Sequence, residues 1–351
     1  VMNKAIQLLT LICLMGWGTS CSPNRMHENY LIEIDSLTYH YPDSAILCLR
    51  RLANIIEKQP IDMQKYYQLL TIKANDKAFI THTSDSLILS LITYKKKKKG
   101  RLLPEAYYYA GRVYSDLHDA PRTLDYFQKA ATLLYNSIDY KLLNVVYSQM
   151  GHLLLYQDVY DEAMKTFKKA YEYTVLAKDR EGSVINLCWI GETFTGYGNA
   201  DSAMFYFRKA YQEAIILGDK ELIDRTKLHL GDLYSQLGAY DSLKTLMEPY
   251  GLYKCADYNC IIGEMYFETN QLDSASYYYN KVIEENEMYT SQRAHLKLAE
   301  IAMAKGDAGF ALEHTRKYKE WTTEIAQATN TETVHKMHSY HNYKKKKKEN
   351  N

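Results

Sequence analysis

The sequence predicts an all-α protein, a right-handed α-solenoid of about eight stacked helical hairpins. The first observation is a register of Gly111, Gly151 and Gly191, which stand forty residues apart. Around each glycine the same residue types recur at the same offsets. The second observation is that the 351 residues include only six prolines, five of them at or near proposed helix boundaries. No stretch shows the alternation of apolar and polar residues that is typical of a strand.

The recurring offsets place bulky and small residues in a fixed order. A phenylalanine lies sixteen residues after each glycine and an alanine lies nineteen after it: Phe127, Phe167 and Phe207, then Ala130, Ala170 and Ala210. Small residues are expected where two helices approach most closely, and rings where they fill the space between helices. With the aromatic or apolar residue four before each glycine, this pattern resembles the tetratricopeptide repeat. The resemblance implies a scaffold that binds proteins or peptides.

The flanks of this region carry weaker copies of the same pattern. Gly231 and Gly263 continue the register, and Ala299 replaces glycine in a last unit that ends near residue 322. A recurring Asp-Ser phrase opens the second helix of the clear repeats, where its acid can cap or neutralise the free amides of the helix N-terminus, and it predicts second helices near residues 43–57 and 85–94. We therefore expect the solenoid over residues 28–322, followed by a helical, polar tail over residues 323–351.

The first residues have the pattern of an export signal. A short basic head precedes an apolar run from Ala5 to Trp17, and Gly18-Thr19-Ser20-Cys21 follows it. These residues resemble the lipobox of bacterial lipoproteins, although Gly18 stands where an aliphatic residue is usual. The resemblance implies a signal peptide over 1–20, lipid on Cys21 and a tether over 21–27. We therefore expect a lipid-anchored, periplasm-facing protein of the bacterial cell envelope.

Several functional classes lack support in the sequence. The formal net charge is +1, so no global excess of positive charge favours nucleic acid. We find no phosphate-binding loop, nucleophile elbow or His-Glu zinc motif, and we expect no catalytic residue, metal or cofactor. The remaining expectation is a non-enzymatic scaffold whose partner is a protein or peptide.

In tetratricopeptide proteins the first helix of each hairpin lines the concave groove, and the residue after the register glycine usually points into it. This row passes from basic to acidic along the chain: Arg112, His152, Glu192, Asp232, Glu264 and Glu300. Tyr108, Tyr156 and Gln236 are neighbouring candidates. The prediction is an extended peptide in the groove, with basic residues at the acidic end of the row.

Three other functions fit the same residues. The abundance of tyrosine, 34 residues, is compatible with a glycan-binding lipoprotein because aromatic faces stack on sugars. The layout also resembles the periplasmic sensor part of a membrane-bound regulator. The interpretation as a cytosolic chaperone adaptor has less support. The carboxylate clamp of such adaptors needs paired Lys and Asn on first helices, whereas Arg112, His152 and Glu192 occupy one of the corresponding rows here.

Overall fold

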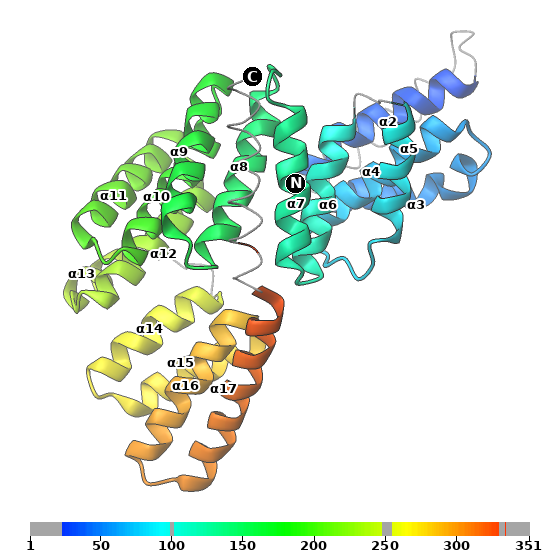
Figure 1. The fold of residues 1–351 in the computed structure, drawn as a ribbon. Helices are drawn as coiled ribbons and strands as arrows, with labels where there is room; N and C mark the ends of the chain where they lie inside the picture. The colour runs from blue at the N-terminus through cyan, green and yellow to red at the C-terminus, as the bar shows by residue number, and fades with distance from the viewer. Residues whose placement is uncertain (1–22, 99–101, 248–254, 330–333, 335–351) are drawn as a thin grey trace, which may run out of the picture. The chain divides into compact units, whose positions relative to one another are not determined.

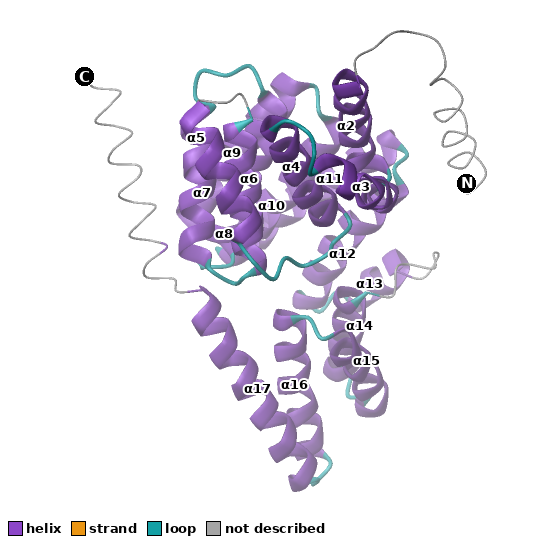
Figure 2. Ribbon diagram, turned by 90° about the vertical axis from the view of Figure 1, so that its right-hand side faces the viewer, coloured by secondary structure: helices purple, strands orange, loops and turns teal. Residues whose placement is uncertain are grey.

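A computed structural model describes residues 23–98, 102–247, 255–329 and 334. Within these ranges all sixteen elements are helices and no strand occurs, as Figure 2 shows, so the all-α prediction is confirmed. The expected signal peptide, Cys21 and most of the polar tail lie outside the described residues. Among the described helices, none is both long enough and apolar enough to span a membrane.

The chain divides into two compact units, Val1–Lys99 and Gly100–Asn351. The first unit contains α2 (Pro23–His40), α3 (Pro42–Ile56), α4 (Ile61–Lys77) and α5 (Ser86–Lys98). Its core joins apolar side chains of α2, α3 and α4, among them Leu31, Leu52 and Leu70. Helices α3 and α5 begin where the Asp-Ser phrase predicted second helices.

The second unit contains six hairpins (Figure 1). In chain order their helices are α6 (Leu103–Asp116) with α7 (Ala120–Leu133), α8 (Tyr140–Leu155) with α9 (Tyr160–Ala177), α10 (Arg180–Gly196) with α11 (Ala200–Leu217), α12 (Lys220–Gln236) with α13 (Tyr240–Met247), α14 (Ala256–Glu268) with α15 (Leu272–Glu285), and α16 (Met288–Ala304) with α17 (Ala308–Thr329). Helix α17 runs past residue 322, where we expected the repeat array to end.

Each register glycine packs against the ring sixteen residues later in the same hairpin. A Cβ atom built on Gly151 would lie 2.7 Å from the ring of Phe167, which is closer than real Cβ atoms approach a neighbour. The equivalent rings of Phe127 and Phe207 make the same contact with Gly111 and Gly191. All three rings are buried. The glycine is therefore required by the close approach of the two helices, as the sequence predicted.

The later hairpins keep this contact with other residue types. The methionine Met247 takes the place of the ring against Gly231, and the Tyr279 ring lies 3.1 Å from a Cβ built on Gly263. The last hairpin differs, because Ala299 replaces the glycine and the residue sixteen positions later, Thr315, is exposed.

Side-chain caps fix where most of the central helices begin. Asp119, Asp139, Asp179, Asn199 and Asp219 each accept a hydrogen bond from a backbone N–H of the first turn that follows. The acid of the Asp-Ser phrase lies two residues after the capping position, inside the first turn of the second helix. There it offsets the positive end of the helix dipole. The phrase therefore marks second helices, but its acid is not their capping residue.

We predict that Gly151→Ala destabilises the protein by about 1–2 kcal/mol, because the overpacking against Phe167 exceeds the gain in helix propensity. Gly309→Ala is the matched control, since the nearest atom to its added Cβ lies at 3.6 Å. That control should be neutral or slightly stabilising. Chemical denaturation of both variants measures the difference, and an equal effect of the two would contradict the packing argument.

Candidate functional site

The six hairpins of the second unit curve so that the first helices face inward. Tyr156 at the end of α8 meets Tyr289 at the start of α16, with ring centroids 5.1 Å apart. These helices belong to the second and the sixth hairpin, so the array must bend back on itself to bring them together. Helices α7 and α17 also touch (Figure 1). The side chains between α8 and α16 therefore line the inside of the curve.

A ladder of contacts connects successive first helices along this inner side. The register position is the place of Gly111, Gly151, Gly191, Gly231, Gly263 or Ala299 in its first helix. The residue directly after one register position contacts the residue that lies two before the register position of the next first helix. The contacts are Arg112 Nη1 to Gln149 Oε1 at 2.8 Å, the rings of His152 and Trp189 at 4.6 Å, Glu192 Oε1 to His229 Nδ1 at 2.6 Å, and Glu264 Oε1 to Lys297 Nζ at 3.2 Å. We call these eight residues, together with Asp232, Arg293 and Glu300, the inner row.

The basic end of the inner row holds a neutral histidine. The His152 ring packs against Tyr156 and Trp189, with centroids 4.5 Å and 4.6 Å away. Burial and then the positive charge of Arg112 lower the pKa of His152 to about 4. At neutral pH this side chain is therefore an uncharged ring that adds apolar surface and hydrogen-bonding capacity.

The centre of the inner row is aromatic. Trp189 stacks on Phe167 at 6.0 Å and meets the His229 ring edge-on at 5.8 Å. Tyr156 keeps 44% of its surface exposed although it contacts Tyr289. Burial, followed by the carboxylates of Asp257 and Glu192, raises the pKa of Tyr156 to about 12. Its hydroxyl therefore stays protonated and can donate a hydrogen bond.

The acidic end of the inner row is interleaved with cations from α16. Arg293 lies 3.7 Å from Asp232 and 3.4 Å from Glu264, and Lys297 lies 3.4 Å from Glu300. Burial raises the pKa of Asp232, and Arg293 only partly opposes it. For Glu264 burial alone would raise the pKa, but the Tyr279 hydroxyl with Arg293 and Lys297 outweighs it and lowers the pKa.

This interleaving changes the expected charge pattern. The row of residues after the register glycine does pass from basic to acidic, but Arg293 and Lys297 neutralise part of the acidic end. Asp232 has no ladder partner, because Ile261 stands at the matching position of α14. Gln236 donates to Asp232 at 2.6 Å from the same helix. The acidic end is thus a set of shared ion pairs and not a free negative surface.

One sequence-predicted candidate must be corrected. Tyr108 is only 5% exposed and packs against Tyr109 and Phe127, so it belongs to the core of the first hairpin of this unit. It lies three residues before the register glycine, a position that faces the partner helix here. The other candidates, Arg112, His152, Tyr156, Glu192, Asp232, Gln236, Glu264 and Glu300, are not fully buried.

A single register position predicts only part of the inner row and leaves out five of its members. Four of them lie two residues before the register position and one lies six before it: Gln149, Trp189, His229 and Lys297, then Arg293. On a helix, residues at −6, −2, +1 and +5 share one face. The sequence does carry polar or aromatic residues two positions before the register residue. They can be recognised as part of the row only when all positions of that helix face are considered together.

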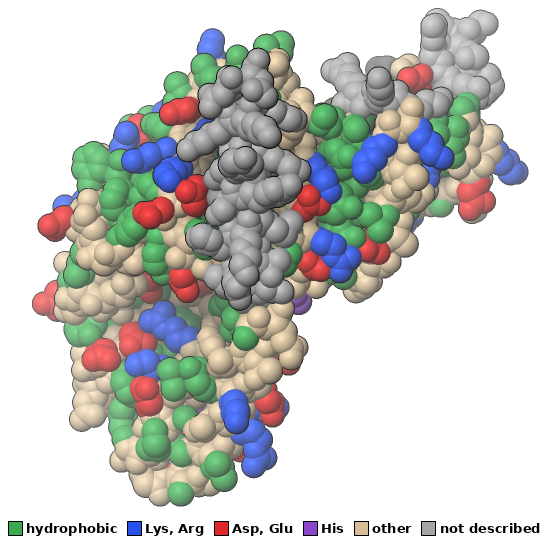
Figure 3. All heavy atoms as spheres, viewed as in Figure 1, with side chains coloured by type: hydrophobic (Ala, Val, Ile, Leu, Met, Phe, Trp, Pro, Cys, Tyr) green, Lys and Arg blue, Asp and Glu red, His purple; other side chains and the backbone are tan. Residues whose placement is uncertain are grey.

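The described residues contain no group of three or more His, Cys, Asp and Glu side chains that could hold a metal ion. Burial raises the pKa of Cys188 and brings that of Cys260 to about 12, so both thiols are protonated and poor nucleophiles. Acidic and basic side chains are interspersed on the face in Figure 3. The inner row is an array of charged, aromatic and hydrogen-bonding side chains.

Comparison with known protein families identifies one type of helical repeat in this chain. The family model of the tetratricopeptide repeat matches residues 256–287, which correspond to the hairpin of α14 and α15. The chain thus contains a tetratricopeptide repeat. A comparison with characterised protein sequences finds no match.

Solved structures of a Rap protein and of the quorum sensor NprR have a similar fold. A Rap protein complexed with Competence and Sporulation Factor matches with a TM-score of 0.66 and 15% identity, covering 92% of this chain and 98% of that one. The apo quorum sensor NprR from B. thuringiensis matches with a TM-score of 0.67 and 11% identity, covering 92% and 93%. NprR in complex with its cognate peptide NprX matches with a TM-score of 0.62 and 16% identity, covering 91% and 98%. At these identities the likeness shows the helical-repeat fold.

We predict that His152 makes the folded state sensitive to acid. The free histidine titrates near 6.5 whereas His152 titrates at about 4, so the unfolded chain takes up its proton first as the pH falls. The stability due to neutral His152 is complete above pH 6.5 and is lost between pH 6.5 and about 4. In denaturation experiments His152→Gln should lose less stability than wild type across this interval, by on the order of 2 kcal/mol.

The exposed His118 provides the control for this measurement, because it lies outside the inner row. His118→Asn should keep the acid sensitivity of the wild type. Parallel pH profiles for the wild type and His152→Gln would contradict the assignment of a neutral His152 with a lowered pKa.

Proposed function

We propose that this protein is a non-enzymatic scaffold or sensor that binds an extended peptide, or an extended segment of a partner protein, along the inner row. The observation that carries the proposal is the ladder between first helices, which arranges charged, hydrogen-bonding and aromatic side chains in one line inside a curved array. The similar fold of NprR in complex with its cognate peptide NprX supports it.

The composition of the inner row favours a peptide with basic residues. Its carboxylates outnumber its cations, and Asp257 adds a further carboxylate whose pKa is raised by burial and by its acidic neighbour Glu192. A cationic side chain of a ligand would relieve the repulsion among these acids. Arg293 could move away from these acids when a ligand cation binds. Its ion pairs with Glu264 and Asp232 are long, at 3.4 Å and 3.7 Å, and 40% of its side chain is exposed.

The aromatic centre would supply the remaining affinity. Tyr156 and Tyr289 expose 44% and 42% of their surfaces where α8 meets α16. Partly exposed tyrosines bury apolar area on binding while their hydroxyls reach backbone groups of a peptide. We place the middle of the ligand at this pair.

The location of the protein is also part of the proposal. The apolar run of residues 5–17 and the Gly-Thr-Ser-Cys sequence that follows support export and attachment through lipid on Cys21. One lipid-anchored end would leave the repeat array free to reach a partner at the bacterial cell envelope. In this setting the chain acts alone or as the sensor part of a membrane-bound regulator.

We predict that removing three inner-row carboxylates weakens peptide binding. The variant Glu192→Gln, Asp232→Asn, Glu264→Gln keeps the side-chain shapes, and it should lower the affinity for a fluorescent Lys-rich peptide by about tenfold or more at low salt. Added salt should weaken the wild-type complex and reduce the difference between the proteins. Fluorescence anisotropy with Lys-rich and Glu-rich peptides of matched length measures both effects.

A second triple variant controls for net charge. Glu172→Gln, Glu181→Gln, Glu284→Gln removes the same number of acids from exposed positions outside the inner row. It should bind like the wild type. Equal affinity of the two triple variants for the Lys-rich peptide would refute the inner row as the binding surface.

We predict that a fatty-acid probe labels the wild-type protein in cells and that Cys21→Ser abolishes the labelling. Lipidation at Cys21 is expected because the thiol follows the apolar run and the small residues of a lipobox-like segment. Membrane fractionation provides the second readout, since Cys21→Ser should leave the membrane pellet. Labelling that persists in this variant would exclude lipid attachment at Cys21.

A further inference from the structure

A cavity lies in the last two hairpins of the array, and its lining contains no residue of the inner row. It has a volume of about 530 Å³ and is bounded by α15, α16 and α17. This volume is in the range of sites for small ligands. Five α17 residues that line it are Phe310, Glu313, Lys317, Trp321 and Glu324. Their spacings of three and four residues place them on one face of that helix.

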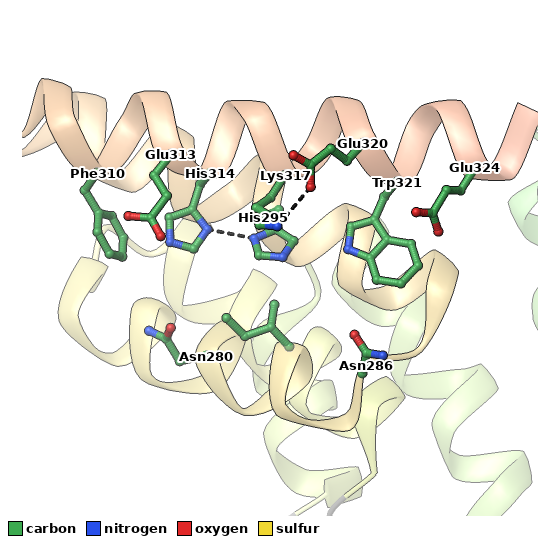
Figure 4. Close-up of a pocket in the computed structure, with 11 residues that line it drawn as sticks. Asn280, Asn286, His295, Phe310, Glu313, His314, Lys317, Glu320, Trp321 and Glu324 are labelled. Carbon is green, nitrogen blue, oxygen red and sulfur yellow. Dashed lines mark hydrogen bonds and ion pairs between the residues drawn. The ribbon is translucent and has the colours of Figure 1, made fainter.

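The cavity combines a flat ring with polar groups on several sides. In Figure 4, Trp321 and Glu324 hang from α17, and Asn286 lies below the tryptophan ring. Asn286 has a left-handed backbone, with φ of 53°, at the end of α15. Its side-chain amide and the Trp321 indole N–H have no hydrogen-bond partner within the described residues. Both groups are therefore available to a ligand.

A histidine pair adds one donor and one acceptor. His295 Nδ1 and His314 Nδ1 lie 2.7 Å apart, so one nitrogen must carry the proton and the other must accept it. The tautomers then leave one Nε2–H donor and one bare Nε2 acceptor. Burial, then His314 and Lys317, lower the pKa of His295 to about 4, and burial also lowers that of His314. The pair is neutral at physiological pH.

This inventory selects among ligand classes. Glu313, Glu320 and Glu324 face a single lysine, Lys317, which already pairs with Glu320 at 2.9 Å, so anions are disfavoured. A free ammonium group has only donors, so it could use the carboxylates and the Asn286 Oδ1 but would leave the Trp321 N–H, the Asn286 NH₂ and the Nε2–H of the histidine pair without an acceptor. A sugar hydroxyl both donates and accepts, and a sugar ring has an apolar face that can lie on an indole.

We propose that the cavity between α15 and α17 binds a neutral, polyhydroxylated ring such as one pyranose unit of a glycan, with Trp321 as the stacking platform and Asn286 as a hydrogen-bonding residue. This site is separate from the inner row and does not depend on peptide binding there. A scaffold with both sites could read a peptide and hold a cell-envelope glycan at the same time.

The test uses the full chain labelled with 5-fluorotryptophan and followed by ¹⁹F NMR. The chain has three tryptophans, and Trp321→Phe and Trp189→Phe assign the two signals of the repeat array. The probes are the methyl glycosides of glucose, galactose, mannose and N-acetylglucosamine. At least one should shift the Trp321 signal saturably, with a dissociation constant on the order of millimolar, while the Trp189 signal stays in place.

Two further measurements make the result decisive. Asn286→Gly keeps the left-handed backbone but removes the amide, and it should weaken the glycoside by about tenfold while peptide binding is unchanged. Putrescine serves as the amine probe and should leave the Trp321 signal unshifted. The proposal is overturned if no glycoside shifts Trp321, if only putrescine does, or if Asn286→Gly binds the glycoside as tightly as wild type.

Discussion

The structure of the second unit depends on one contact within a hairpin. A large side chain of the second helix packs against the register glycine of the first helix. Phe167 lies against the backbone at Gly151, and Phe127 and Phe207 repeat this contact in their own hairpins. The contact sets how closely the two helices approach and therefore how one hairpin presents its surface to the next. Because it recurs every forty residues in the central hairpins, small and equal rotations accumulate into the bend that brings α8 to α16.

The inner row is a consequence of this regularity. When neighbouring hairpins are related by a constant step, the position after one register residue always meets the position two before the next. The ladder therefore admits many side-chain pairs, as the neutral contact of His152 with Trp189 and the charged contact of Glu264 with Lys297 show. The scaffold fixes where side chains lie, and their identities decide what they bind. The ladder is interrupted at Asp232, where Ile261 stands at the matching position, and Arg293 pairs with Asp232 instead.

Most of the fold could be predicted from the sequence because its main contacts join residues that are close along the chain. In the three central hairpins the register glycine and the phenylalanine sixteen residues later touch within one repeat, so their spacing indicates the packing. The candidate site was less accessible. Members that directly follow the register glycine, such as Glu192, were predicted correctly as part of the row. Arg293 and Lys297 were not predicted, because they pair with acids of earlier hairpins. Tyr108 was predicted to face the groove but lies in the core. The pairing of acids with α16 depends on the curvature of the array, which no local pattern encodes. The cavity around Trp321 likewise needs three helices from two hairpins.

The central claim is that the array curves until α8 and α16 meet around the inner row, and a distance measurement tests it most directly. In a straight stack, four steps of 8–10 Å would separate these helices by roughly 35 Å. Spin labels on Tyr156→Cys and Tyr289→Cys, measured by pulsed dipolar spectroscopy, should instead report a distance well below this straight-stack value, because the rings of Tyr156 and Tyr289 are in contact, with centroids 5.1 Å apart. The four cysteines of the described helices are either buried or half-buried, which limits background labelling. A narrow distribution at the short distance agrees with a curved array whose first helices face inward. A distribution centred near the straight-stack value would contradict both the curvature and the inner row that depends on it.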